Sequence, residues 1–262
     1  MKKKVLMKKM AVFSLLVVAY AFVSHEGDCF EIVGGREVLP HSRPYMAYLN
    51  TLCGGALIKP NWVLSAAHCK KLKNIQVTLG AHSRNKNENT KQKFQVKTVV
   101  VHPHFNSTTY SNDLMLLQLN QSAALNKFVS TLPLPHSGKD VKAGIKCSVA
   151  GWGALRFGNQ MEDKLREVNV TIIDRQTCNG PDYYEQFEIS RSMLCAGDPK
   201  GGKDSCWGDS GSPLLCYEGY DLIYRGIVSF GINCGVAHKP GVYTLLTEEY
   251  LRWIQQTIQH YE

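Results

Sequence analysis

The sequence predicts an all-β fold that ends in a single C-terminal helix. Three observations support this class: the strand-like stretches are short, they are rich in β-branched and aromatic residues, and turn-forming residues separate them. This spacing favours a sandwich or a barrel over a βαβ architecture. The predicted strands are residues 62–65, 75–79, 94–101, 114–119, 147–150, 165–173, 224–230 and 242–246.

The last segment differs from the rest of the chain because its apolar residues follow a helical spacing. Tyr250, Ile254 and Ile258 lie four residues apart, so residues 248–260 are predicted to form an amphipathic helix. The stretch TLPLPHSGKD at 131–140 contains two prolines and a glycine. It is the predicted mid-chain crossover between two groups of strands.

The N-terminus has the pattern of a secretory signal peptide. Lysines at positions 2, 3, 4, 8 and 9 precede an apolar run from Ala11 to Val23. This run is shorter than the roughly 20 residues that a membrane-spanning helix needs, so no membrane anchor is expected. We expect residues 1–29 to be the signal peptide, residues 30–31 an activation dipeptide, and residues 32–262 the mature chain.

The mature chain is basic and rich in cysteine. Residues 1–31 hold five lysines and three acids, so 25 basic and 19 acidic residues remain, a net charge of +6. A chain of 231 residues can form one large β domain or two fused halves. In a secreted chain the eight remaining cysteines predict four disulfides, with 105 possible pairings. Cys29 leaves with the signal, so no disulfide-linked dimer is expected, and the absence of close C-x2-4-C spacing argues against a metal site.

Three motifs carry the chemistry: WVLSAAHC holds His68, SNDLMLLQL holds Asp113, and GDSGSPLLC holds Ser210. A lone histidine or aspartate is more often structural than catalytic, but the three together fit nucleophilic catalysis. A serine hydroxyl needs an imidazole to take its proton, and the imidazole needs a carboxylate to orient it. An α/β-hydrolase is disfavoured, because its nucleophile motif ends in glycine where Ser212 stands and its residues run serine, acid, histidine.

Six motifs together resemble the trypsin/chymotrypsin-like serine proteases: IVGG, LSAAHC, NDLMLL, AGWG, DSCWGDSGSPL and KPGVYT. The resemblance covers essentially all of residues 32–262. It implies two antiparallel six-stranded β-barrels, at about 32–135 and 136–262, with a cleft between them and the C-terminal helix packed outside. It also implies the disulfide pairs Cys53 with Cys69, Cys147 with Cys216, Cys178 with Cys195, and Cys206 with Cys234.

The resemblance assigns further roles around the nucleophile. The backbone N–H groups of Gly208 and Ser210 are expected to form the oxyanion hole. Asp204, six residues before Ser210, takes the place of the pocket-floor carboxylate that selects arginine or lysine; an exposed loop acid is the alternative. The expected wall and edge of that pocket are Gly231, Gly241 and Ser229.

The resemblance also implies a zymogen. Cleavage after Glu31 would free the amino group of Ile32, which is expected to pair with Asp209 and shape the oxyanion hole. Ser212 replaces the glycine that is usual in the family, and its side chain is expected to point away from the hole. Trp207 is expected either at the pocket rim or in plain packing.

Glu31 is an unsuitable cleavage site for an enzyme whose own pocket ends in a carboxylate, so activation by another enzyme is expected. A dipeptide ending in glutamate is similar to the propeptides of granule proteases that a dipeptidyl peptidase such as cathepsin C trims. The segments EVLPHSRPYMAYL, LGAHS and KLREVNVTIIDR resemble the granzymes, those of granzyme A type first and of granzyme K type next. This implies a cytolytic immune protease stored in secretory granules. A mast-cell tryptase-like or other extracellular enzyme is the alternative, and a catalytically silent binding protein is disfavoured by the intact triad.

The mature chain also carries clusters of basic residues and glycosylation sequons. Basic residues cluster at Lys70, Lys71 and Lys73, and at Arg84, Lys86, Lys91, Lys93 and Lys97. They are either a solvated loop surface or an anion-binding face for sulfated proteoglycan or protein substrates. Specific nucleic-acid binding is not expected, because no binding fold or aromatic platform is recognisable, and no cofactor is expected. Possible N-glycosylation sites are Asn106, Asn120 and Asn169.

Overall fold

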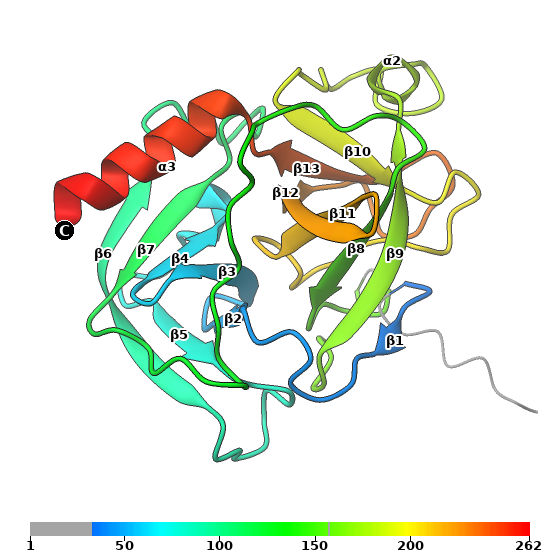
Figure 1. The fold of residues 1–262 in the computed structure, drawn as a ribbon. Coiled ribbons are helices and arrows are strands. Elements are labelled where there is room, and N and C mark those ends of the chain that lie inside the picture. Colours follow the sequence, from blue (N-terminus) through cyan, green and yellow to red (C-terminus); the bar gives the residue numbers. More distant parts are fainter. Residues whose placement is uncertain (1–32, 157) are drawn as a thin grey trace, which may run out of the picture.

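The computed structural model of the protein describes residues 33–156 and 158–262, which form mostly antiparallel strands. Six of these strands close a first barrel in the order β2-β3-β4-β7-β6-β5, drawn in blue to green in Figure 1. Its strands are β2 (Met46–Leu49), β3 (Cys53–Lys59), β4 (Trp62–Ser65), β5 (Gln76–Leu79), β6 (Gln92–Val101) and β7 (Met115–Leu119).

Six later strands pair in the order β9-β10-β13-β12-β11-β8, and pairing between β8 and β9 closes them into a second barrel. The two closed, six-stranded antiparallel barrels confirm the predicted fold. The connection from β7 to β8 contains the predicted crossover and runs between the barrels in Figure 1. The strands of the second barrel are β8 (Lys146–Gly151), β9 (Arg166–Ile173), β10 (Met193–Gly197), β11 (Pro213–Glu218), β12 (Asp221–Phe230) and β13 (Gly241–Leu245).

Each end of the described chain packs against the barrel that the other half of the chain forms. The short strand β1 (Arg36–Glu37) comes from the N-terminal side but pairs with β9 of the second barrel. The helix α3 (Glu248–Tyr261) follows the second barrel but buries Tyr250, Ile254 and Ile258 in the core of the first. Its first turn is capped by Thr247, whose hydroxyl accepts a hydrogen bond from Tyr250 N at 3.3 Å.

The apolar interior is continuous across the two barrels. Strands β4 and β7 pair with each other and are buried along their whole length. Leu215, Tyr224 and Ile227 of the second barrel belong to the same buried cluster. Both sides of β4 are covered by protein, so its first three residues are apolar and the hydroxyl of the last, Ser65, donates to the Gly54 carbonyl at 2.8 Å. The loop that follows β4 therefore has a rigid base.

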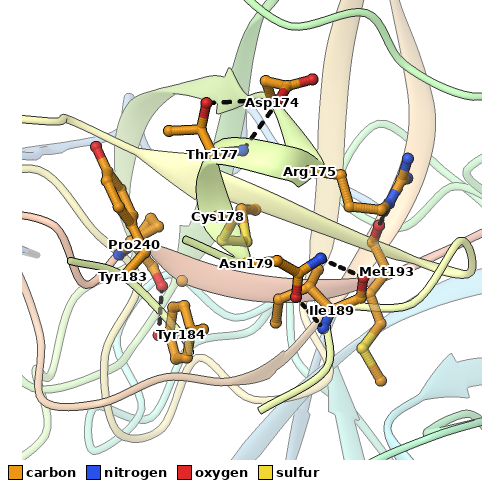
Figure 2. Close-up of a disulfide and its surroundings, with 12 residues drawn as sticks. Asp174, Arg175, Thr177, Cys178, Asn179, Tyr183, Tyr184, Ile189, Met193 and Pro240 are labelled. Carbon is orange, nitrogen blue, oxygen red and sulfur yellow. Dashed lines mark hydrogen bonds between the residues drawn. A yellow bond between two sulfur atoms is a disulfide. The ribbon is translucent and has the colours of Figure 1, made fainter. Parts of the chain in front are cut away.

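Four disulfides cross-link the described residues, and they are the pairs that the family resemblance implies: Cys53–Cys69, Cys147–Cys216, Cys178–Cys195 and Cys206–Cys234. Figure 2 shows the surroundings of Cys178, which ends the short helix α2 (Arg175–Cys178). Asp174 caps this helix by accepting a hydrogen bond from Thr177 N at 3.0 Å. The bridge therefore ties a capped turn on the surface to β10 of the second barrel.

Among the described residues, no helix is both long and apolar enough to span a membrane. The predicted signal peptide, the activation dipeptide and Ile32 lie outside the described residues.

Candidate active site

His68 lies where the first barrel meets the second. It belongs to the short 3-10 turn η1 (Ala67–Cys69), which follows the buried strand β4. The disulfide between Cys53 and Cys69 fixes this turn to β3. The His68 side chain is 16% exposed, so one edge of the imidazole stays open to an incoming molecule.

Asp113 precedes β7 and is fully buried. One of its carboxylate oxygens accepts the backbone N–H of His68 at 2.9 Å, and the other lies 2.7 Å from His68 Nδ1. The Ser229 hydroxyl, on β12 of the second barrel, donates to this second oxygen. Because the carboxylate occupies Nδ1, the Nε2 of His68 is the nitrogen that can exchange a proton with a neighbouring group.

Ser210 lies in the loop before β11 and contacts the loop that carries His68. Its carbonyl oxygen accepts the backbone N–H of Gly54 at 2.7 Å and lies 3.8 Å from Cys69 Sγ. Among the described residues, no hydrogen bond joins Ser210 Oγ to His68 Nε2. Hydrogen bonds of this kind are often long before substrate binds and shorten in the complex. The structure thus brings together three residues that are 45 and 97 positions apart in sequence.

Gly208 has a backbone φ of +100°, which favours glycine. The carbonyl of Trp207 accepts a hydrogen bond from Ala154 N at 2.7 Å. Since C=O and N–H point in opposite directions across a trans peptide, this bond sets the direction of the Gly208 N–H. The Trp207 side chain is 67% exposed, unlike a core residue.

Ser212, the departure from the family pattern, is fully buried. A Cβ built on Gly54 would lie 2.0 Å from Ser212 Oγ, so the hydroxyl faces the Gly54 backbone of β3. Among the described residues, Ser212 Oγ has no hydrogen-bond partner. The missing side chain at Gly54 therefore makes room for the extra hydroxymethyl group.

Asp204 is 2% exposed, which contradicts the exposed-loop alternative. Its two oxygens accept the backbone N–H groups of Gly235 at 3.0 Å and Gly241 at 3.1 Å. A Cβ on Gly241 would come within 2.8 Å of the carboxylate, and one on Gly231 would lie 3.8 Å from Gly241 Cα. Burial raises the pKa of Asp204 to about 7, although the backbone donors oppose this shift.

Asp209 is fully buried beside the nucleophile loop. Its oxygens accept the backbone N–H groups of Gly153 at 2.8 Å and Cys206 at 2.9 Å. A Cβ on Gly151 or Gly153 would lie 2.0 or 2.4 Å from these oxygens, so both positions lack space for a side chain. Burial raises the pKa of Asp209 to about 6. The expected partner, Ile32, lies outside the described residues.

Two side-chain contacts at the site were not predicted from the sequence. The ring of Tyr110 lies edge-on to His68 with centroids 5.7 Å apart, and it also contacts Phe230 at 5.1 Å. Ser229, which is expected at the pocket edge, directs its hydroxyl to Asp113. Neither contact has a local sequence signal, because each joins residues more than 40 positions apart.

The one group of potential metal-binding side chains among the described residues is Cys53, His68 and Cys69. The two cysteines form a disulfide with each other. Metal binding by cysteine requires the thiolate, which a disulfide does not provide.

Comparison with known proteins supports the interpretation of this geometry. The family model named Trypsin matches residues 32–254. Granzyme A of Bos taurus is 49% identical over 252 residues, which cover 95% of this chain and 94% of the relative. Mast cell protease 3 of Ovis aries is 43% identical over 262 residues (97% and 98%), and trypsin V-B of Rattus norvegicus is 40% identical over 255 residues (96% and 99%).

Proposed function

Because the chain belongs to the trypsin family of serine proteases, we propose that it cleaves proteins after arginine and lysine. It is a serine endopeptidase, and the buried carboxylate of Asp204 supports the finer assignment. None of the ion pairs in the described part of the chain involves Asp204. A buried anion is costly without a cation. A guanidinium or ammonium group of the substrate supplies that cation.

In the proposed mechanism, Ser210 Oγ attacks the carbonyl of the cleaved bond while His68 Nε2 accepts its proton. His68 returns the proton to the departing amine, and Asp113 stabilises the charged imidazole. Water then hydrolyses the acyl-enzyme on Ser210. The backbone N–H groups of Gly208 and Ser210 stabilise the oxyanion, and each such donor contributes about 2.7–4 kcal/mol.

The specificity proposal is tested on protein that starts at Ile32. Peptide substrates with Arg, Lys, Phe and Asp before the cleaved bond are compared by kcat/KM, together with an unbiased peptide library. We expect Arg and Lys to be preferred, and preference for Phe or Asp would overturn the role of Asp204. A serine-directed phosphonate probe, with Ser210→Ala as control, separates an active enzyme from a silent binding protein.

Activation is proposed to depend on Asp209 and on the amino group of Ile32. Asp209 links Gly153 to Cys206 through its two oxygens, so a new ammonium group beside it would order the loop that carries Gly208 and Ser210. The carboxylate of Asp204 disfavours binding of Glu31 in the pocket. A different enzyme is therefore needed to cleave the chain after Glu31. We expect a dipeptidyl peptidase of cathepsin C type to remove Phe30 and Glu31. Mature-like activity in protein that retains this dipeptide would contradict the proposal.

Granule storage and cytolytic function are proposed from the similarity to granzyme A. The exposed lysines of the first barrel are the proposed contact for sulfated proteoglycan: Lys70, Lys71, Lys73, Lys86, Lys93 and Lys97. Arg84 and Lys91 are less suited to this role, because they are partly buried and donate to backbone carbonyls.

Heparin chromatography tests the proteoglycan contact. A triple change of Lys70, Lys71 and Lys73 to glutamine should lower the salt concentration of elution. A matched triple control changes the exposed Lys139, Lys142 and Lys146, at and before the start of β8. Elution of the wild type below physiological ionic strength would favour a merely solvated surface.

Asn106, Asn120 and Asn169 are all exposed and are proposed glycan acceptors. Asn106 is the preferred site because it lies in a loop, whereas Asn169 lies within β9. Mass analysis before and after enzymatic deglycosylation measures occupancy, and an unmodified Asn106 in secreted protein would contradict this preference.

A further inference from the structure

Met161 differs from the other methionines of the described residues. Met46, Met115 and Met193 are 2%, 0% and 3% exposed, whereas Met161 is partly exposed at the edge of a cluster that contains Trp152. A peroxide must reach the sulfur of a methionine to oxidise it. Met161 is therefore the methionine of the described chain that is most accessible to such an oxidant.

The side chain of Met161 lies directly against Gly208. A Cβ built on Gly208 would lie 2.5 Å from Met161 Cε and 3.1 Å from Met161 Cγ. The thioether sulfur lies between these two carbons in the side chain, so the group that can be oxidised packs on the glycine of the proposed oxyanion hole.

A second connection runs through the backbone. Met161 and Ala154 face each other in an antiparallel bridge. Ala154 N donates to the Trp207 carbonyl at 2.7 Å, and this bond sets the direction of the Gly208 N–H. A change in the volume or polarity of the Met161 side chain can thus alter the orientation of the Gly208 N–H in two ways. One is direct side-chain contact, and the other is the backbone of Ala154.

The backbone of Met161 is also restrained by hydrogen bonds. Arg84, from the first barrel, donates to the Met161 carbonyl at 3.0 Å and to the Glu162 carbonyl at 2.6 Å. The guanidinium of Arg84 lies 5.6 Å from the centre of the Tyr48 ring. These contacts restrain the backbone of Met161, so a change in its side chain is accommodated by the side chain and by its neighbours, which include Gly208.

We propose that Met161 is an oxidation site through which a hydroperoxide lowers the activity of this enzyme. The sulfur attacks one peroxide oxygen, the S–O bond forms as the O–O bond breaks, and the peroxide is reduced to an alcohol or water. The sulfur loses two electrons and becomes a sulfoxide. The polar oxygen replaces an apolar contact with Gly208 and displaces its N–H. This inference rests on the proposed function, because that N–H acts on the oxyanion.

The experiment treats activated wild type, Met161→Leu and Met193→Leu with hydrogen peroxide. Peptide mass spectrometry locates the added oxygen, and each protein is compared with its own untreated kcat and KM. Loss of an oxyanion donor costs about 10²–10³ in kcat, and for a displaced donor we expect roughly tenfold with little change in KM. A methionine sulfoxide reductase should restore the activity. Met161→Leu should resist the treatment, whereas Met193→Leu should respond like the wild type.

An independent measurement follows the Gly208 amide resonance in glycine-labelled protein that starts at Ile32. Its shift should change on oxidation of the wild type and not of Met161→Leu. Unchanged kcat with fully oxidised Met161, equal loss in Met161→Leu, or prior oxidation of the buried methionines would overturn the proposal. A protein that does not prefer Arg or Lys but shows the amide shift would refute the proposed specificity while supporting the contact between Met161 and Gly208.

Discussion

Asp113 and Asp204 are both buried carboxylates of the candidate active site, but different groups surround them. Asp113 accepts hydrogen bonds from the His68 imidazole, the His68 backbone and the Ser229 hydroxyl. Asp204 accepts hydrogen bonds from backbone N–H groups, including those of Gly235 and Gly241. The first carboxylate has its partners within the protein and is suited to orient a base. The second lacks a cation among the described residues and is suited to select a ligand.

The largest effect is expected for Asp113→Asn. The amide can donate to His68 Nδ1 and would favour the wrong imidazole tautomer, so kcat should fall by about 10⁴ with little change in KM. Steady-state kinetics on an arginyl peptide provide the measurement. A loss below tenfold would mean that other contacts suffice to orient His68.

Asp204→Asn should act on substrate choice rather than on the chemical step. Leaving a buried substrate cation unpaired costs about 2–5 kcal/mol, so kcat/KM for arginyl substrates should fall by about 10²–10³. Phenylalanyl substrates should be affected far less. Asp221→Asn, at an exposed position, is the matched control. Equal losses for both substrate types would remove the distinction between the two carboxylates.

Ser229→Ala tests whether the hydrogen bond from the second barrel to the Asp113 carboxylate contributes to catalysis. A hydrogen bond to a charged group contributes about 1.5–3 kcal/mol, so kcat should fall by about 10–100-fold. Rescue by Ser229→Thr would support the hydroxyl as the important group. A larger effect on KM than on kcat would instead favour the role at the pocket edge that the sequence suggested.

The smallest effect concerns the pH dependence of ligand binding. Burial raises the pKa of Asp204 from 3.8 to about 7, so the carboxyl is neutral below that pH and ionised above it. Because a benzamidinium ion pairs with the ionised form, its Kd should fall by about tenfold between about pH 6 and pH 8. Calorimetry measures this slope, which Asp204→Asn should remove.

The same shift predicts how stability depends on pH. Between the unfolded and folded pKa values of Asp204 the folded chain binds the extra proton, so the free energy of unfolding should fall as pH rises from about 4 to about 7. Denaturant unfolding of the wild type and Asp204→Asn measures this contribution. An equally steep fall in the variant would assign it to other groups.

The strands were predictable where β-branched and aromatic residues dominate, and missed where packing demands small ones. Strands β4 and β7 overlap the predicted stretches, whereas β3, β10 and β11 contain glycine, alanine, cysteine or proline and were not predicted. In β3, a Cβ on Gly54 would collide with Ser212, and one on Gly55 would lie 2.8 Å from Val63. Close packing around these glycines overrides their low β-propensity.

In the candidate active site, too, local motifs were predictive and long-range contacts were not. The motifs identified His68, Asp113 and Ser210, and the structure brings their loops together. The contacts of Ser229 with Asp113 and of Met161 with Gly208 were missed. They join residues that are 116 and 47 positions apart, and one partner of each pair, Ser229 or Met161, lies outside the quoted motifs. The motifs therefore predict the candidate reacting groups, but not the residues that contact them.

The exchange of chain ends between the barrels has a mechanical consequence. A break in the crossover at 131–140 would leave two fragments, one with His68 and Asp113 and the other with Ser210. The first fragment would still contribute β1 to the sheet of the second, and the second would still cover the first with α3. Each fragment would thus still bind the other through its terminal element. The two halves of the site would keep their relative positions without a continuous chain between them.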